Sequence, residues 1–440
     1  MKNKIDSHDI QLTVYARKEG GRPYDLYAQK EVLQAIIDKQ MFQPFGGLSV
    51  ELRNPADKDW EEIFSNGDLA TIKVNGRTKM TALINSVGYG SILQDNTVTN
   101  TLSIKAVDLG IMFSKFGKFI TDPTWRVNSS SFGLNFFSAF QRIRNQYTYA
   151  KYDLKTIFRL TWTEMVGAFM KATSELGIPF TFSNGMTFDM AFLNTFDGVS
   201  DSFDNSYPLE IHILKENYPD VWQFWLKISN PPFTELFCDS VYKGQQIGQF
   251  GSKDFAVPTK DDFMVICRPN PWLGGRFEIL KKQVNEIDPI NFIQINATKS
   301  AAEVKSVYLV YPEGGANPAS YRMSGDFAVD ANLMSKWGVD FQEVPLSFLA
   351  YKENARDYAK GMADILKEGY ANIDNYYSGA SLMTYTDVRV GQAIKMPHKL
   401  GSKKQMYALV VGVTDQFKAP ASMHTQITFV RGEIDKGVSL

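Results

Sequence analysis

The residues of this chain that most often catalyse reactions or bind metals are few and far apart. Histidine and cysteine are the strongest candidates, because both bind zinc and imidazole transfers protons near neutral pH. Zinc sites usually show them at short spacings such as His-x-x-x-His or Cys-x-x-Cys. The chain has six of these residues, none at such a spacing: His8, His212, Cys238, Cys267, His398 and His424. We therefore predict no metal site, no cofactor site and no catalytic residue among them.

The two cysteines, Cys238 and Cys267, each lie within a run of apolar residues. Free cysteine in such a run usually behaves as a small buried hydrophobe. Two cysteines are also too few for a disulfide framework, which fits a reducing compartment such as the cytoplasm. We expect both thiols to be buried and to have no redox role.

Three aspartates in a polar stretch over 194–207 could supply oxygen ligands to calcium. They are Asp197, Asp201 and Asp204. The stretch lacks the Asp-x-Asp-x-Asp-Gly order of a calcium-binding loop and its closing glutamate. A solvated surface loop is the better interpretation.

A glycosidase needs two carboxyl groups, one on each side of the bond that it cleaves. Glu164 and Glu175 are candidates, but both are predicted at a helix end or surface, where charged side chains are usually solvated. The pair Gly88 and Gly90 lacks the third glycine and the following helix of a dinucleotide fingerprint, and no P-loop or Gly-x-Ser-x-Gly elbow occurs. We predict that the chain is not an enzyme, and a carbohydrate-degrading protein remains an alternative.

The composition indicates a large, folded, multi-domain protein. The residues are 44% hydrophobic and 13% aromatic, which is enough to form sizeable cores. A chain of 440 residues is too long for one ordinary domain. The net charge of −1 gives no electrostatic footprint for nucleic acid. The first residues lack the apolar core of a signal peptide, and no apolar run approaches the ~20 residues of a membrane span. We expect no membrane insertion.

The strongest signal for a β-hairpin in the chain lies over residues 69–87. Two β-rich runs, 69–74 and 78–87, flank Asn75-Gly76, and Asn-Gly is a strong signal for a type I′ turn because both positions need positive φ. A third run over 99–106 alternates apolar and polar residues, as a half-buried strand does. These runs predict an antiparallel meander.

Other elements complete a first β domain, residues 1–120. We expect strands over 11–17 and 48–53, a helical or mixed segment over 29–40, and a short helix with Asp108 as its N-cap.

The region 121–287 is predicted to contain helices and strands. An aromatic-rich span over 128–152 is typical of core, and Thr161 and Glu164 fit a capping box that starts a helix ending near Leu176. A second helix over 221–228 has Asp220 as its cap. The predicted strands are 234–238 and 262–269.

Residues 288–377 form an α/β region and residues 378–440 a set of C-terminal strands. The α/β region has short strands over 292–295 and 306–310 and a long amphipathic helix over 353–376. The C-terminal strands are predicted over 380–390, 406–413 and 424–431.

Three blocks of the sequence resemble phage tail and baseplate hub proteins, the family of contractile-tailed phages and related injection systems. The first runs from Gly67-Asp68 through Ala-Leu-Ile-Asn-Ser-Val to Asp108-Leu-Gly. The second pairs Asn-Pro-Pro-Phe-x-Glu-Leu-Phe over 230–237 with Arg-Pro-x-Pro-Trp over 268–272. The third ends in Thr-x-Ile-x-Phe-Val-Arg-Gly over 425–432.

The resemblance implies a mixed β and α+β fold, with two tail-tube-like antiparallel β-barrels and intervening helical and α/β domains. It implies a structural virion protein at the centre of the tail baseplate, where a homotrimer forms a ring that joins the sixfold tail tube to the threefold spike. Its partners would be the tail tube protein, the spike or tip protein and other baseplate proteins, with DNA only in transit through the channel. Besides the carbohydrate-degrading protein, a host-receptor-binding tail protein remains an alternative.

Overall fold

The structure, a computed structural model, describes most of the two ends of the chain and parts of its middle. The described residues are 8–28, 30–53, 59–94, 97–115, 151–153, 188–192, 206–208, 220–229, 231–245, 261–273, 278, 281, 284–300, 304–312, 325–346, 355–371, 376–419 and 422–435.

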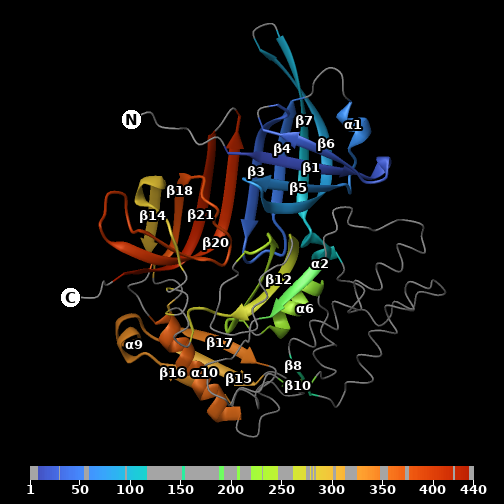
Figure 1. The fold of residues 1–440 in the computed structure, drawn as a ribbon. Helices are drawn as coiled ribbons and strands as arrows, with labels where there is room; N and C mark the ends of the chain where they lie inside the picture. The colour runs from blue at the N-terminus through green and yellow to red at the C-terminus, as the bar shows by residue number, and fades with distance from the viewer. Residues whose placement is uncertain are drawn as a thin grey trace, which may run out of the picture.

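Most of the described chain is β-structure, and its main element is one large curled sheet of 13 strands (Figure 1). Eleven of them follow one another along a path, in the order β14 (Phe292–Lys299), β18 (Tyr376–Thr384), β21 (Ser422–Ile434), β20 (Gln405–Lys418), β3 (Val32–Gln40), β4 (Gly47–Arg53), β7 (Thr97–Asp108), β6 (Arg77–Gln94), β5 (Leu69–Val74), β1 (Ile10–Ala16) and β2 (Arg22–Tyr27). All neighbours on this path are antiparallel. Off the path, β19 (Ala393–Pro397) pairs with β20, and β13 (Asn285–Glu286) pairs with β19.

The N-terminal and C-terminal strands meet in this sheet at the β3–β20 pair, whose register runs from Gln34 opposite Lys418 to Gln40 opposite Gly412. Across this seam, the Thr414 hydroxyl donates a hydrogen bond of 2.6 Å to Asp38 Oδ1. Strands about 380 residues apart in sequence therefore share one ladder of backbone hydrogen bonds.

Two apolar cores lie along the sheet. The first fills the lobe built by β1–β7 and includes Trp60 and Phe64, from the region of the short helix α1 (Trp60–Ile63). The second lies between the C-terminal strands and the strands of the middle region, and includes Phe237, Ile266 and Phe429. The chain thus has an N-terminal and a C-terminal lobe that share a sheet.

Two three-stranded sheets, one two-stranded sheet and several helices complete the described fold. A three-stranded sheet in the middle contains β11 (Thr234–Val241), β12 (Asp262–Pro269) and β9 (Phe188–Phe192), beside α2 (Ile111–Lys115) and α6 (Val221–Ile228). A second contains β16 (Asp326–Val329), β15 (Val307–Pro312) and β17 (Phe341–Leu346), with α9 (Ala331–Trp337) and α10 (Ala355–Tyr370). The remaining elements are η1 (Arg17–Glu19), the β8–β10 pair (Lys151–Asp153 and Ser206–Pro208) and η2 (Pro289–Asn291).

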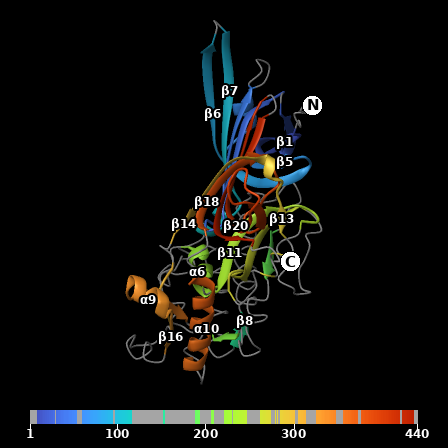
Figure 2. The same cartoon turned by 90° about the vertical axis from the view of Figure 1, so that its left-hand side faces the viewer.

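The predicted meander is confirmed. Strands β5, β6 and β7 are consecutive and antiparallel, and the turn has positive φ at both central residues, 51° at Asn75 and 75° at Gly76. The pair β6–β7 continues well beyond its neighbours, and Figure 2 shows it projecting from the rest of the molecule. It forms an arm, because β4 pairs with β7 only as far as Thr101.

The predicted helix over 221–228 is also confirmed. Asp220 caps it, with its carboxylate accepting a hydrogen bond of 2.7 Å from the Gln223 backbone N–H. Trp222, Phe224 and Trp225 are buried. The predicted strands over 11–17, 48–53, 234–238, 262–269, 292–295 and 306–310 all appear, most of them longer than predicted.

The prediction of a helical or mixed segment over 29–40 was wrong, because Val32–Gln40 is strand β3. The apolar residues at 32, 33, 36 and 37 have helical spacing, but a bulge near Val32 shifts the register, and Ala35, Ile37 and Lys39 then alternate inward. Pairing with β4 and β20 on both sides decides the structure here.

Three other boundaries differ from the prediction. The short helix exists, but it begins at Ile111, and Asp108 ends strand β7 instead of capping it. The long helix ends at Tyr370, and Tyr376 already begins β18. That strand stops at Thr384, so residues 385–390 form a loop. Both carboxylate-bearing segments, at 108 and at 387, are held by buried cations described below.

Several predictions fall outside the described residues. They are the aromatic span up to residue 150, the helix from Thr161 to Leu176 with Glu164 and Glu175, the aspartates 197, 201 and 204, and His212. Within the described residues, no helix combines the length and the apolar composition needed to cross a bilayer.

Candidate functional site

The residues singled out for chemistry are far apart in the described structure. Cys238 and Cys267 are free and buried on β11 and β12, and burial raises the pKa of the Cys267 thiol to about 12. His8 contacts Asn75, His398 contacts the Lys404 carbonyl, and His424 lies on β21. In the parts of the chain that the structure describes, no group of three or more metal-ligating side chains comes together.

Among the described residues, a group of buried charged side chains lies where the N-terminal lobe, the middle sheet and the C-terminal strands meet. At its centre is Lys79 of β6, whose side chain is only 4% exposed. Its Nζ lies 3.0 Å from Asp387 Oδ1 and 3.1 Å from Asp415 Oδ2, and donates a hydrogen bond to the Val388 carbonyl. One lysine of the first lobe therefore joins two carboxylates of the C-terminal region, Asp387 in the 385–390 loop and Asp415 on β20.

Arg389 extends the group to the middle sheet. Its guanidinium donates hydrogen bonds of 2.5 Å to the backbone carbonyls of Ser240 and Thr78, and its Nε lies 3.4 Å from Asp387 Oδ1. The Ser240 hydroxyl accepts a further hydrogen bond from the Thr81 backbone N–H. A side chain of the 385–390 loop thus ties β6 to β11. We call Lys79, Asp387, Arg389 and Asp415 the junction cluster.

A second buried ion pair lies nearby, between Lys39 of β3 and Asp108 at the end of β7. The other oxygen of Asp108 accepts a hydrogen bond of 2.9 Å from the Gly110 backbone N–H. This contact holds Asp108 at the end of its strand, where the sequence predicted a helix cap.

Two members of the junction cluster, Asp387 and Lys79, keep their charges at neutral pH. Burial opposes ionisation of Asp387, but Lys79, Arg389 and Arg77 outweigh it and hold the pKa of this carboxyl at about 2. Burial also opposes the charge of Lys79, yet Asp415 and other neighbours raise the pKa of the amine above its ordinary value. Groups with such pKa values do not exchange protons near pH 7. The arrangement suits the positioning of strands.

Sequence reasoning missed this cluster, although one signal was present. Strand β6 carries Lys79 in the middle of a hairpin predicted to be core. Thr78, Lys79, Met80 and Thr81 are all buried, because both faces of the strand are covered. A lysine in a fully buried strand requires a partner charge.

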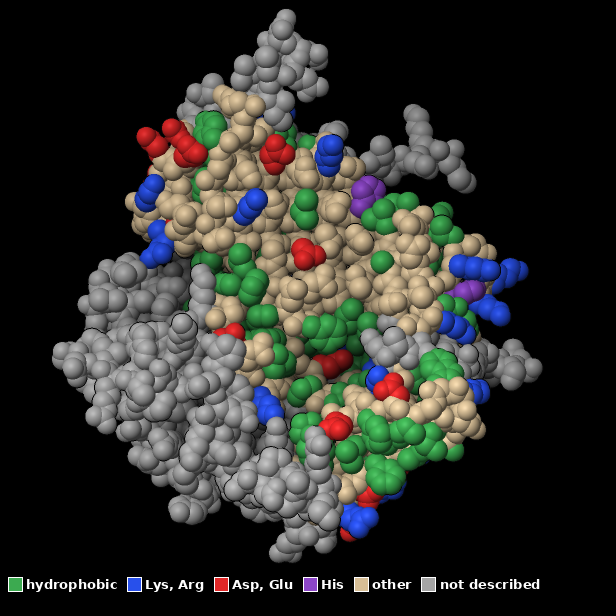
Figure 3. Space-filling model, turned by 180° about the vertical axis from the view of Figure 1, so that it is seen from behind, with side chains coloured by type: hydrophobic (Ala, Val, Ile, Leu, Met, Phe, Trp, Pro, Cys, Tyr) green, Lys and Arg blue, Asp and Glu red, His purple; other side chains and the backbone are tan. Residues whose placement is uncertain are grey.

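The small unit with α9 and α10 exposes apolar side chains. Tyr308 of its central strand faces α10, where its ring lies 6.4 Å from that of Tyr370. Successive residues of a strand point to opposite faces of a sheet. Phe327 and Phe341 are next in sequence to the residues paired with Tyr308, so they lie on the face that points away from α10, and both are exposed. Trp337, at the end of α9, is 58% exposed. Figure 3 shows a gathering of apolar side chains over this unit.

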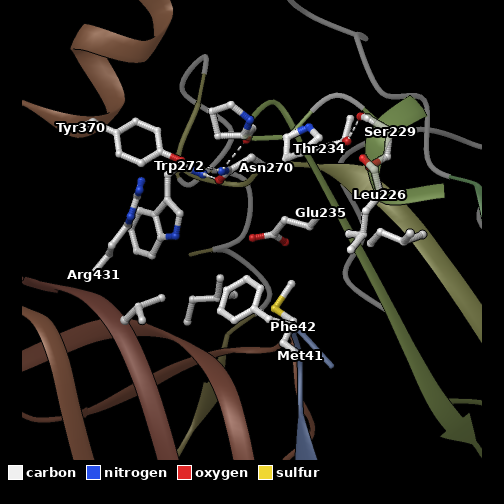
Figure 4. Close-up of a pocket in the computed structure, with 15 residues that line it drawn as sticks. Met41, Phe42, Leu226, Ser229, Thr234, Glu235, Asn270, Trp272, Tyr370 and Arg431 are labelled. Carbon is white, nitrogen blue, oxygen red and sulfur yellow. Dashed lines mark hydrogen bonds between the residues drawn. The ribbon is translucent and has the colours of Figure 1, made fainter. Parts of the chain in front are cut away.

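A cavity of about 410 Å³ lies where the N-terminal lobe, the middle sheet and the C-terminal strands meet (Figure 4). Glu235 is the only acidic residue among the described residues that line it, and its carboxylate forms two 2.8 Å contacts with the Arg268 guanidinium. Burial raises the pKa of Glu235, against the opposing effect of Arg268 and Arg431. The lining residues are Met41, Phe42, Leu226, Ser229, Pro231, Pro232, Thr234, Glu235, Leu236, Asn270, Trp272, Tyr370, Leu409, Val430 and Arg431.

Comparison with known proteins gives matches in structure alone. No protein-family model matches the sequence, and no curated protein sequence matches it. Among solved structures, the 43 kDa tail protein of prophage MuSo2 from Shewanella oneidensis aligns with a TM-score of 0.51 at 12% identity, over 97% of this chain and 98% of that one. The tail protein from Neisseria meningitidis MC58 aligns with a TM-score of 0.47 at 10% identity, over 97% and 96% of the two chains.

The alignment with the prophage MuSo2 tail protein is the evidence for a shared fold, because its TM-score is 0.51. It spans nearly the whole of both chains, so it covers the lobes, the middle sheet and the small α/β unit together. The chain has the fold of a phage tail protein, as the sequence resemblance predicted.

Proposed function

We propose that this protein is a structural component of a phage tail, the central hub of the baseplate. In this proposal, three copies form a ring that joins the sixfold tail tube to the threefold spike and leaves a channel for DNA. The observation that carries the proposal is the shared fold with a prophage tail protein over 97% of this chain and 98% of the other.

The arrangement of the two lobes supports a ring. Two cores lie along one sheet, and we propose that they correspond to the two tail-tube-like barrels. Three chains with two such lobes each present six similar units, which is the number needed to meet a sixfold tube.

The edges of the large sheet support assembly through neighbours. Strands β2 and β14 each pair on one side only within the described residues. Such edges carry unpaired backbone N–H and C=O groups, and neighbouring subunits can cover them. The β6–β7 arm and the apolar face with Phe327 and Phe341 add further surface for contacts. We propose the tail tube protein, the spike or tip protein and other baseplate proteins as partners, and the virion tail as the location.

We further propose that the protein performs no chemical step. Support comes from the junction cluster, whose charges are paired with one another and whose Asp387 keeps a pKa of about 2. The cavity also departs from the glycosidase pattern, because Glu235 has no second carboxylate beside it among the described lining residues.

The oligomeric state in solution tests the proposal. Light scattering on the purified full chain should give a particle three times the 49.7 kDa mass of the chain. A structure of the assembled ring should show interfaces that bury more than the ~1,200–2,000 Å² of ordinary complexes. Hydrolysis of glycans by the pure chain would favour the carbohydrate-degrading alternative, and binding to host cells the receptor-binding one. A chain that stays monomeric in its native particle would contradict the hub.

A further inference from the structure

Arg431 of β21 is a buried cation that lines the cavity of Figure 4. The residue is 6% exposed, and its Nη1 has no hydrogen-bond partner within the described part of the chain. Its guanidinium carbon lies 3.5 Å from the ring centroid of Tyr370 and 5.8 Å from that of Trp272. Aromatic rings stabilise the charge but accept no strong hydrogen bond in the plane of the guanidinium. A buried donor of this kind costs free energy until an acceptor reaches it.

The backbone at Arg431 directs this side chain. Tyr407 lies opposite Glu433 and Leu409 opposite Val430, so two residues of β21 oppose one residue of β20. This is a β-bulge, and Arg431 has a φ of 53°, in the left-handed region. A non-glycine residue in that region costs free energy, and bulges often re-aim a side chain at a functional site.

Glu235, the nearby acidic residue, does not neutralise the charge of Arg431, because it is paired with Arg268. Glu235 already has a guanidinium of its own, since both Nε and Nη2 of Arg268 lie 2.8 Å from its Oε2. The two arginines and the one glutamate leave one positive charge. The cavity is therefore suited to a single negative charge.

The rest of the cavity wall is mainly apolar and firmly held. Asn270 donates hydrogen bonds to the Pro232 carbonyl and the Tyr370 hydroxyl, and its Oδ1 accepts one from the Trp272 backbone N–H. These bonds fix the two aromatic residues beside Arg431. Phe42 also lines the cavity and is 68% exposed, so the cavity reaches the surface there.

We propose that this cavity binds a carboxylate carried next to an apolar side chain on a partner polypeptide. The carboxylate pairs with Arg431, and the apolar side chain lies against Trp272, Phe42 and the aliphatic residues of the wall. A guanidinium prefers a carboxylate or a phosphate, and the closeness of Glu235 disfavours a doubly charged phosphate. A cavity of about 410 Å³ has room for a small ligand or an anchoring side chain. The inference does not depend on the hub function.

Calorimetric titration of the full chain with small probes tests the proposal. N-acetylphenylalanine has the carboxylate and the apolar group, whereas N-acetylphenylalaninamide lacks only the charge. The acid should bind at least about tenfold more tightly than the amide, since a charge-assisted hydrogen bond is lost. N-acetyl-Phe-Glu-amide supplies the carboxylate from a side chain, and its affinity relative to the acid tells whether a chain terminus or a side chain is preferred.

Two variants locate the binding. Arg431→Gln should weaken binding of the acid at least about tenfold and remove the preference for it over the amide. Arg22→Gln, an exposed arginine of β2, is the matched control and should bind as the unmodified chain does. If Arg431→Gln does not fold, Phe42→Ala at the exposed rim should still weaken binding of both probes.

Three outcomes would overturn the proposal. One is equal binding of acid and amide, or no binding of either at millimolar concentration. Another is unchanged binding by a folded Arg431→Gln variant. The third is tighter binding of inorganic phosphate than of the acid.

Discussion

Strand β6 is held in two different ways, by apolar packing in the core of the N-terminal lobe and by buried ion pairs at the junction cluster. In the lobe core, Ile72, Ile84 and Ile104 pack with other apolar residues. At the junction, Lys79 of β6 lies among Asp387, Asp415 and backbone carbonyls. Apolar packing is favourable with many partners and in many geometries, whereas a buried ion pair is favourable only in one.

This difference suggests a division of roles. The apolar core supplies the free energy of folding of the lobe, and the junction cluster fixes how the lobe sits against the middle sheet and the C-terminal strands. Buried charges add little net stability compared with apolar side chains of the same size, but removal of one partner leaves the other uncompensated. The comparison therefore predicts unequal costs for substitutions in the two regions.

The largest effect is expected for Lys79→Met. Asp387 and Asp415 would lose their shared cation while staying buried, which costs about 3–5 kcal/mol of the free energy of unfolding. Denaturant unfolding measures this cost. Lys73→Met is the control, because Lys73 is more exposed and its pair with Asp261 is worth ~0–1 kcal/mol. Equal costs for the two lysines would show that the junction cluster has no orienting role.

The next effect is expected at the Asn75-Gly76 turn. Gly76 has a φ of 75°, and a Cβ added there would meet no atom within 4 Å, so Gly76→Val tests mainly backbone strain. We expect a loss of about 1–3 kcal/mol in thermal unfolding and less trimer as a consequence. Gly88→Val lies on strand β6, which follows the turn; Gly88 has open space around an added Cβ and no positive φ, so this variant should be nearly silent. Identical melting of the two variants would exclude a register-setting role for the turn.

A smaller effect depends on pH. Asp387 has a pKa of about 2 in the folded state and an ordinary value of 3.8, so it stabilises the native state above pH 3.8. That contribution is lost as the pH falls toward 2. The difference in unfolding free energy between the unmodified chain and Asp387→Asn should therefore shrink over this interval, by up to about 2 kcal/mol. A difference that stays constant from pH 5 to 2 would contradict the assigned pKa.

The smallest effect on stability is expected at Trp337. The side chain is 58% exposed, so Trp337→Ser should change the free energy of unfolding by no more than about 0.5 kcal/mol. If the apolar face of this unit contacts a neighbour, the same variant should reduce assembly in light scattering. A large loss of stability would place Trp337 in the core of its own unit instead.

The sequence predicted local elements better than their connections. The meander and the Asp220-capped helix depend on turn chemistry and capping within a few residues, and both were found. Strand β3 was missed because its structure depends on pairing with β4 on one side and on the other with β20, which is more than 370 residues away. The junction cluster and the cavity were missed for the same reason. Lys79, Glu235 and Arg431 have no unusual local spacing, and only the fold brings their partners to them.

Electron cryo-microscopy of the assembled tail that contains this chain tests the central proposal most directly. The hub account predicts three copies around the tail axis, at the end of the tube and above the spike, with the two lobes of each copy forming a pseudo-sixfold ring around the channel. Absence of the chain from the tail, or copies placed only at the periphery and away from the axis, would contradict it.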